Sequence, residues 1–163
     1  MKQTFTRILL VAMVIFITSS LFAQRAALSG EWKLDEKKSE LGEFARAATS
    51  IKADQKDNAI TITRVTPGFN GGDPMTNTIT LPFDGKVVES EGFRGSKRKS
   101  TAKWSDDGKT LVVSNTMSFE RDGQTSEFKS TESWSITKDG LLSVVTHSNS
   151  PRGESTVKAV YSK

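Results

Sequence analysis

Cysteine is absent from this chain of 163 residues, and histidine occurs once, as His147. Without cysteine the chain forms no disulfides and offers no thiolate metal ligands or thiol nucleophiles. A single histidine cannot build a metal site of several imidazoles. Apolar runs are scarce too, because only the N-terminal stretch is nearly unbroken. The chain must therefore rely on a hydrophobic core without cross-links.

Sequence signatures of enzymes are missing as well. Gly153 and Ser155 lack the second glycine of a nucleophile elbow, since Val157 stands there. The glycines at 68, 71 and 72 precede no helical pattern, which argues against a phosphate-binding loop. The acidic pair 106–107 lacks the spacing of a calcium loop. We expect no enzyme, no metal and no cofactor, although 19 acidic residues leave a carboxylate pair for glycosyl transfer open.

Residues 1–23 have the pattern of a secretory signal peptide. Lys2 and Arg7 are followed by the apolar run Ile8–Thr18 and by Ala23, a small residue suited to cleavage. The run is too short for a membrane-spanning helix. We therefore predict an exported protein, periplasmic or extracellular, that starts at Gln24 and has no stable membrane anchor. An uncleaved anchor is the alternative.

The remaining residues, 24–163, are long enough for a single domain with a real core. Loss of Lys2 and Arg7 leaves 21 basic residues against 19 acidic ones, a net charge of +2. So small an excess is no signature of nucleic-acid binding. We expect a monomer that has no nucleic-acid partner.

Asp-Gly dipeptides occur four times, at 84–85, 107–108, 122–123 and 139–140. Asp-Gly favours tight hairpin turns, because Gly adopts positive φ angles without steric cost and Asp tolerates them. The segments between them alternate apolar and polar residues, which is the pattern of half-buried strands. The sequence predicts about ten strands, and no segment has a convincing helical pattern. The strands are expected at 29–34, 49–56, 59–66, 75–83, 86–93, 97–104, 109–120, 125–137, 141–148 and 154–161.

An open meander of this kind leaves an exposed strand at each edge, and closure into a barrel removes both edges. We therefore predict an all-β fold, an antiparallel up-and-down β-barrel of about 8–10 strands, with an open sandwich as the alternative. The loop Pro67–Pro74 is rich in Gly and Pro. We expect it at the mouth of the barrel, where it would gate entry.

Two strands resemble a known family. The Gly-x-Trp segment at Gly30–Trp32 resembles the strand that opens lipocalins and fatty-acid-binding proteins, where the tryptophan closes the barrel floor. Residues 156–161 are similar to the last strand of a fatty-acid-binding protein. The chain thus resembles a bacterial lipocalin-like (calycin) small β-barrel, with distant similarity to fatty-acid-binding proteins. The resemblance implies a ligand-holding interior with Trp32 at one end.

The chain departs from that family at two places. Fatty-acid-binding proteins carry an Arg-x-Tyr pair in the last strand that clamps a carboxylate, whereas this chain has Ala159 and Tyr161. Lys158 is one residue off and is expected to point outward. The family also has a helical pair after its first strand, but Asp35–Ala47 is long enough for one short helix only.

Candidate binding residues follow from strand parity. Asn115, Glu132 and His147 each share the parity of apolar neighbours on their strands. A buried carboxylate must be paired or protonated, and a few polar groups in an apolar cavity orient a ligand. A register shift of one residue would instead turn all three to solvent, and a satisfied core network without a ligand is also open. The apolar lining is expected from Phe83, Met117, Phe128, Trp134 and Tyr161.

Arg94, Lys97, Arg98 and Lys99 form a basic cluster at a predicted hairpin. Such a cluster can bind phosphate, an anionic headgroup or an acidic polysaccharide. Lysines at the edge of a sheet also prevent edge-to-edge pairing, and exposed charges are common. We therefore interpret the cluster as a solvated turn.

The leading hypothesis is an exported binding protein that holds a small apolar or amphipathic ligand inside the barrel without transforming it. The rival is a surface-interaction module, a barrel filled by its own side chains that binds an envelope component or a protein partner. An enzyme comes third. The volume of the interior separates the first two. Small residues at expected inward positions would leave room: Gly30, Ala53, Ser130, Ser143 and Ala159.

Overall fold

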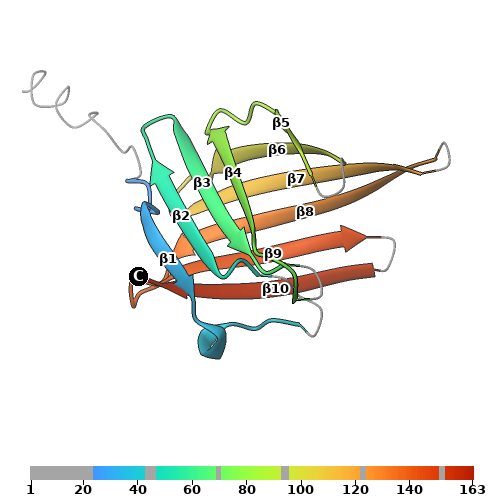
Figure 1. Ribbon diagram of the computed structural model, residues 1–163. Coiled ribbons are helices and arrows are strands. Elements are labelled where there is room, and N and C mark those ends of the chain that lie inside the picture. Colours follow the sequence, from blue (N-terminus) through green and yellow to red (C-terminus); the bar gives the residue numbers. More distant parts are fainter. Residues whose placement is uncertain (1–23, 43–46, 69–70, 93–95, 122–123, 151–152) are drawn as a thin grey trace, which may run out of the picture.

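The computed structural model describes residues 24–42, 47–68, 71–92, 96–121, 124–150 and 153–163, without the side chain of Arg121. The predicted signal peptide lies outside these residues. Ten antiparallel strands follow one another along the chain (Figure 1), as the sequence predicts. Their bounds are β1 (Gly30–Leu34), β2 (Ser50–Gln55), β3 (Ala59–Thr66), β4 (Met75–Pro82), β5 (Val88–Glu91), β6 (Lys97–Trp104), β7 (Thr110–Arg121), β8 (Gln124–Ile136), β9 (Leu142–Ser150) and β10 (Gly153–Ser162).

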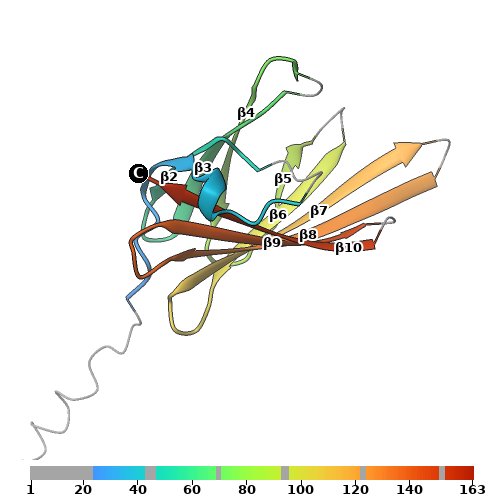
Figure 2. The same cartoon turned by 90° about the horizontal axis from the view of Figure 1, so that it is seen from below.

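The strands form one sheet that curls into a nearly closed barrel. Its order is β4-β3-β2-β1-β10-β9-β8-β7-β6-β5, so β1 joins the two halves by pairing with β10. The edges are β4 and β5, which are not hydrogen-bonded to each other. Seen from below, β4 leans away from β5 and β6 (Figure 2). The predicted all-β, up-and-down barrel is confirmed.

Tight turns connect the strands at one end of the barrel. Gly85, Gly108 and Gly140 have φ angles of 76°, 68° and 75°, as Asp-Gly predicts. The preceding aspartates also stabilise two of these turns. The carboxylates of Asp84 and Asp107 each accept the backbone N–H of the residue two positions later, at 3.0 Å in both turns. The fourth dipeptide, 122–123, lies outside the described residues.

The segment after β1 forms one turn of 3₁₀ helix, η1 (Glu36–Lys38), in place of a helical pair. Asp35 caps it, since its carboxylate accepts the Lys38 N–H. Glu40 then bridges to Lys158 on β10, so the segment is tied to the barrel wall. No helix of the described residues is long and apolar enough to cross a membrane.

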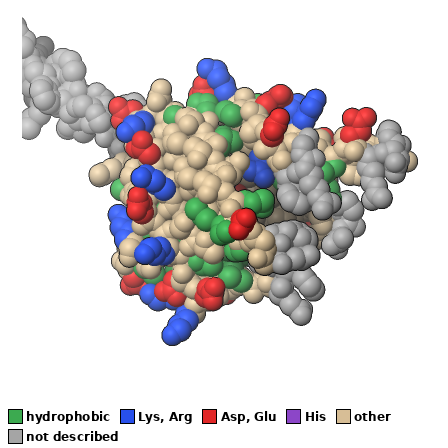
Figure 3. Space-filling view, in the orientation of Figure 1, with side chains coloured by type: hydrophobic (Ala, Val, Ile, Leu, Met, Phe, Trp, Pro, Cys, Tyr) green, Lys and Arg blue, Asp and Glu red, His purple; other side chains and the backbone are tan. Residues whose placement is uncertain are grey.

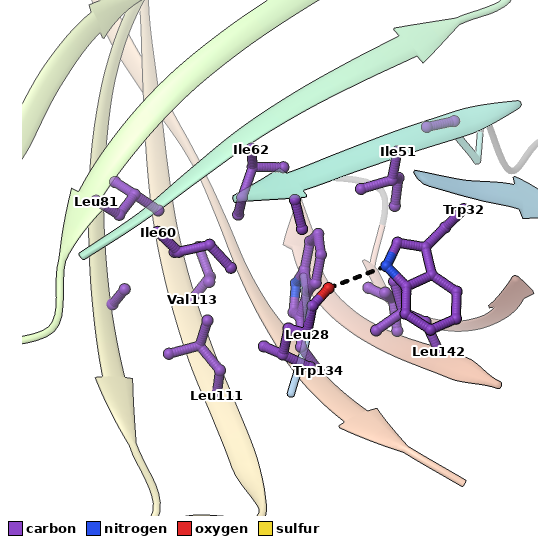
Figure 4. Close-up of a cluster of buried hydrophobic side chains, with 14 of the residues drawn as sticks. Leu28, Trp32, Ile51, Ile60, Ile62, Leu81, Leu111, Val113, Trp134 and Leu142 are labelled. Atoms are coloured by element: carbon purple, nitrogen blue, oxygen red, sulfur yellow. Dashed lines mark hydrogen bonds between the residues drawn. The ribbon is translucent and has the colours of Figure 1, made fainter. Parts of the chain in front are cut away.

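The hydrophobic core fills the end of the barrel that carries the tight turns (Figure 4). Trp32 is 2% exposed, and its indole N–H donates to the Leu28 carbonyl at 3.0 Å. Leu28 precedes β1 and is fully buried, so the N-terminal segment is part of this core. The prediction that Trp32 is buried near one end is confirmed. We call this end the closed end.

The outer surface of β3 and β4 is polar but uncharged. Thr61 faces Thr80 and Thr63 faces Thr78 across the two strands, with hydroxyl oxygens 2.8 and 2.9 Å apart. Acidic and basic side chains gather mainly around the margins of the face seen in Figure 3. This exterior contrasts with the interior, where charged groups meet inside the barrel.

Candidate ligand-binding site

A cavity of about 650 Å³ occupies the barrel interior beyond the core. Its walls come from β2 to β10 and from Ala47 and Ala48, which follow η1. On β7 to β10 the lining residues run from Val144, Ala159 and Tyr161 next to the core to Met117, Ser148 and Ser155, which lie nearer the connections at 122–123 and 151–152. The barrel is therefore not filled by its own side chains.

Strand register arranges the β7–β10 wall in rows of increasing polarity. The deepest row aligns Trp134, Val144 and Ala159 across β8, β9 and β10. The next row aligns Glu132, Thr146 and Val157. The row above them aligns Asn115 of β7 with Ser130, Ser148 and Ser155, and we call these three serines the serine row. The wall thus changes from apolar next to the core to polar at the serine row, and Met117 of β7 lies beyond that row.

An ion pair crosses the interior between β3 and β8. The Arg64 guanidinium lies 2.5 Å from the Glu132 carboxylate, and the two side chains are only 19% and 15% exposed. The Trp134 indole N–H donates to the same carboxylate at 2.8 Å, and the guanidinium carbon lies 5.2 Å from the Trp134 ring centre. The charge of Glu132 is therefore compensated where the cavity meets the core.

Asn115 extends this network toward β6. Its amide nitrogen lies 3.4 Å from the Glu132 carboxylate, and its amide oxygen accepts the hydroxyl of buried Ser100 at 2.7 Å. Five polar side chains from β3, β6, β7 and β8 are thus linked through Glu132. Such a network fixes the orientation of each member, because a buried polar group without a partner is costly.

Arg98 of β6 is a second cation in the cavity. Its half-buried side chain lines the cavity, and no ion pair to it exists among the described residues. Burial lowers the pKa of Arg98, and the positive charge of Arg64 lowers it further, while Glu132 acts in the opposite direction. Glu91 also borders the cavity, but it is exposed and has the same parity as Glu89, which pairs with Lys99 on the outer face. Inside the cavity two guanidinium groups therefore face one carboxylate.

Tyr161 of β10 completes the inner wall. It is 2% exposed, and burial raises the pKa of its phenol to about 12. Arg64 lowers the pKa and Glu132 raises it, so both charges of the ion pair act on this phenol. Tyr161 is therefore a neutral hydroxyl at physiological pH, able to donate or accept a hydrogen bond.

The structure brings together half of the residues predicted from the sequence. Asn115, Met117, Glu132 and Tyr161 line the cavity. The three other apolar residues that were predicted, Phe83, Phe128 and Trp134, do not line the cavity, each for a different reason. Whether any of these residues contacts a ligand stays a prediction.

Phe83 belongs to the closed end, where its ring packs edge-on against Trp104 at 5.6 Å. Trp134 is fully buried beneath the cavity and acts through its hydrogen bond to Glu132. Phe128 has the inward parity but lies beyond the cavity on the β7–β8 hairpin, where it is 37% exposed and packs against Phe119. Each side chain supports the barrel without lining the cavity.

The predicted inward orientation of His147 is wrong. Its neighbours Thr146 and Ser148 line the cavity, whereas His147 is exposed and makes a 2.9 Å hydrogen bond with Thr156 of β10. The prediction took Val145 as the marker of the inward face. Strand β9 carries apolar residues on both faces, and the buried Val144 marks the inward one.

Sequence reasoning missed Arg64 and Arg98. Extending the alternation of Ile60 and Ile62 by two residues would have placed Arg64 inside. Extending the alternation of the buried residues Ala102 and Ser100 by two residues would likewise have placed Arg98 inside the barrel. The basic cluster is thus divided, because Lys97 and Lys99 are exposed while Arg98 enters the cavity. Arg94 lies outside the described residues.

The Pro67–Pro74 loop is only partly described, since residues 69–70 are outside the described part of the chain. Thr66 and Met75, at its two ends, both line the cavity. The two ends of the loop therefore lie at the cavity. The gating role of the loop stays a prediction. Among the described residues no group of three acidic or histidine side chains is arranged to hold a metal ion.

Comparison with known proteins reveals the fold. No protein-family model matches the sequence, and no curated protein sequence is significantly similar to it. A crystal structure of zebrafish ileal bile acid-binding protein complexed with cholic acid is similar, with a TM-score of 0.51 and 18% sequence identity. The match covers 83% of this chain and 97% of the zebrafish chain. The zebrafish protein is a fatty-acid-binding protein, so this chain has the lipocalin-like, fatty-acid-binding-protein barrel fold that its first and last strands resemble.

Proposed function

We propose that this protein is an exported binding protein that holds a small amphipathic molecule inside its barrel without transforming it. The observation that carries the proposal is the cavity of about 650 Å³, whose walls combine apolar side chains with a few polar and charged groups. Sites for small molecules have volumes of about 300–1,000 Å³ and combine apolar walls with a few placed polar groups. The cholic acid in the similar zebrafish structure supports the same use of this fold.

The open interior disfavours the rival function. A surface-interaction module was expected to have a barrel filled by its own side chains. Filling the cavity would need several more large residues at positions that hold Ser130, Ser148 and Ala159. The small side chains at these positions instead leave space for a ligand.

Binding of Nile red, a neutral apolar dye, tests the proposal. The dye should fluoresce in the wild-type protein, and Ser148→Trp should lower its affinity more than about tenfold, because the indole fills the cavity. His147→Trp is the matched control, since it adds the same ring to the outer face of the same strand. Its affinity should stay within about twofold of wild type. Equal loss in both variants, or no dye binding to the wild type, would refute the proposed function.

Export is tested separately on protein recovered from its own cells. Its intact mass should correspond to a chain that starts at Gln24. Native mass spectrometry of the same material should show an additional small molecule bound to the folded protein. A full-length mass in the membrane fraction would favour the anchored alternative.

A further inference from the structure

Charge inside the cavity is unbalanced. Arg64 is neutralised by Glu132 at 2.5 Å, but Arg98 has no carboxylate within ion-pair distance among the described residues. Arg98 is also half-buried, so water compensates its charge incompletely. A bound anion would compensate the positive charge of Arg98. Carboxylates suit this role, because a guanidinium group binds them through two parallel hydrogen bonds.

Hydroxyl groups without partners lie close by. Ser130, Ser148 and Ser155 stand side by side on three neighbouring strands. Their hydroxyls, and that of Thr146 one row deeper, make no hydrogen bond to any group in the described part of the chain. Neighbouring strands are about 4.8 Å apart, so the serine row offers three donor-acceptor groups over about 10 Å.

Strand register fixes the order of the positions that carry these groups along the barrel. Arg98 pairs with Met117, which is two residues nearer the mouth than Asn115. Asn115 is in register with the serine row, and Val144 and Ala159 lie deeper. From the core to the mouth, the strand positions carry apolar side chains, then Glu132 of the ion pair together with Thr146, then the hydroxyls of the serine row, and then Arg98.

We infer that the ligand of this cavity is a hydroxylated amphipathic anion. Its apolar end would lie against Val144 and Ala159, its hydroxyl groups along the serine row, and its anionic group at Arg98. The inference rests on the proposed function and narrows its ligand class. A plain alkyl carboxylate would leave the serine row without partners, and a neutral hydroxylated amphiphile would leave Arg98 without one.

Three probes separate these contributions, each measured by displacement of Nile red below its micelle-forming concentration. Octyl β-D-glucuronide carries an alkyl chain, hydroxyls and a carboxylate. Octyl β-D-glucoside lacks the carboxylate, and decanoate lacks the hydroxyls. The glucuronide should bind at least about tenfold more tightly than either of the others.

Matched variants assign each contribution to a residue. Arg98→Met should weaken the glucuronide about tenfold and leave the glucoside within about twofold, whereas Lys97→Met and Lys99→Met should change neither. Ser130→Ala combined with Ser148→Ala should weaken the glucuronide and the glucoside but not decanoate. Ser133→Ala is its control, because Ser133 has the opposite parity on β8.

Other results would overturn the inference. Decanoate or the glucoside binding as tightly as the glucuronide would exclude the proposed ligand class, and so would an equal loss of glucuronide and glucoside in Arg98→Met. Arg98→Lys, which keeps the charge, should retain part of the glucuronide affinity; if it behaves like Arg98→Met although both variants fold, charge is not what Arg98 contributes. Nile red binding that no probe displaces would reject this inference and leave the proposed function standing.

Discussion

Glu132 is the centre of the polar network inside the barrel, because its carboxylate contacts the side chains of Arg64, Trp134 and Asn115. Glu132→Gln removes the charge and leaves the Arg64 guanidinium uncompensated in a mostly buried position. Breaking a buried pair on one side costs about 3 kcal/mol or more. We therefore expect the free energy of unfolding, measured by urea denaturation, to fall by about 3 kcal/mol.

The control for this prediction is the surface pair of Glu31 and Lys52, which are 78% and 66% exposed at a similar N–O distance of 3.0 Å. Glu31→Gln should cost less than about 1 kcal/mol, since exposed pairs contribute little. The double variant Arg64→Met/Glu132→Met should be more stable than Glu132→Gln, because no unpaired charge remains. Equal losses in the two single variants would show that Glu132 is solvated rather than buried.

Tyr161 gives the folded protein a measurable alkaline signature. It is the only tyrosine of the chain, and burial raises its pKa to about 12, against about 10 in an unfolded chain. A raised pKa in the folded state means that the stabilising contribution is complete below pH 10 and is lost between about pH 10 and 12. The tyrosinate absorbance should therefore rise near pH 12 in the native protein and near pH 10 in denaturant.

Tyr161→Phe supplies the check on this assignment. Wild-type stability should fall between about pH 10 and 12 by on the order of 2 kcal/mol more than that of the variant. A native titration midpoint at pH 10 would mean that the phenol is open to solvent.

At the level of the strands, the sequence predicts almost everything that depends on neighbouring residues. Alternation and Asp-Gly turns place ten strands within a few residues of their observed bounds, since both signals are local. The inward face of β9 was harder to predict, because this strand has apolar residues on both faces: Leu142 and Val144 on one face and Val145 on the other. Which face turns inward is decided by pairing with β8 and β10, which is not local.

The residues of the candidate site were harder to predict from the sequence than the strands. Glu132 and Asn115 were found because they interrupt apolar positions, whereas Arg64 was not singled out and Arg98 was assigned to a solvated basic turn. Arg64 can lie inside the barrel because the Glu132 carboxylate compensates its charge. The partner comes from a strand 68 residues away, and a single strand carries no sign of it.

For the molecule as a whole, the closed end depends on residues that precede the first strand. Leu28 is fully buried, its N–H donates to the Gln55 side chain at 2.8 Å, and its carbonyl accepts the Trp32 indole N–H. The Arg25 guanidinium lies 5.0 Å from the ring centre of Phe83. Cleavage after Ala23, as the sequence predicts, would keep this whole segment with the barrel.

A chain that starts at Gln24 should therefore be as stable as the full-length protein, whereas one that starts at Ser29 should be less stable. The loss should be about 2–5 kcal/mol, because the shorter chain lacks the buried Leu28 side chain and leaves the Trp32 indole N–H without its acceptor. Urea denaturation of the two chains measures the difference. Leu28→Ala in the chain that starts at Gln24 should account for most of it, because it removes the same side chain and keeps the backbone carbonyl. If the chain that starts at Ser29 is fully stable, the segment is dispensable, and the closed end is held by the strands and their turns alone.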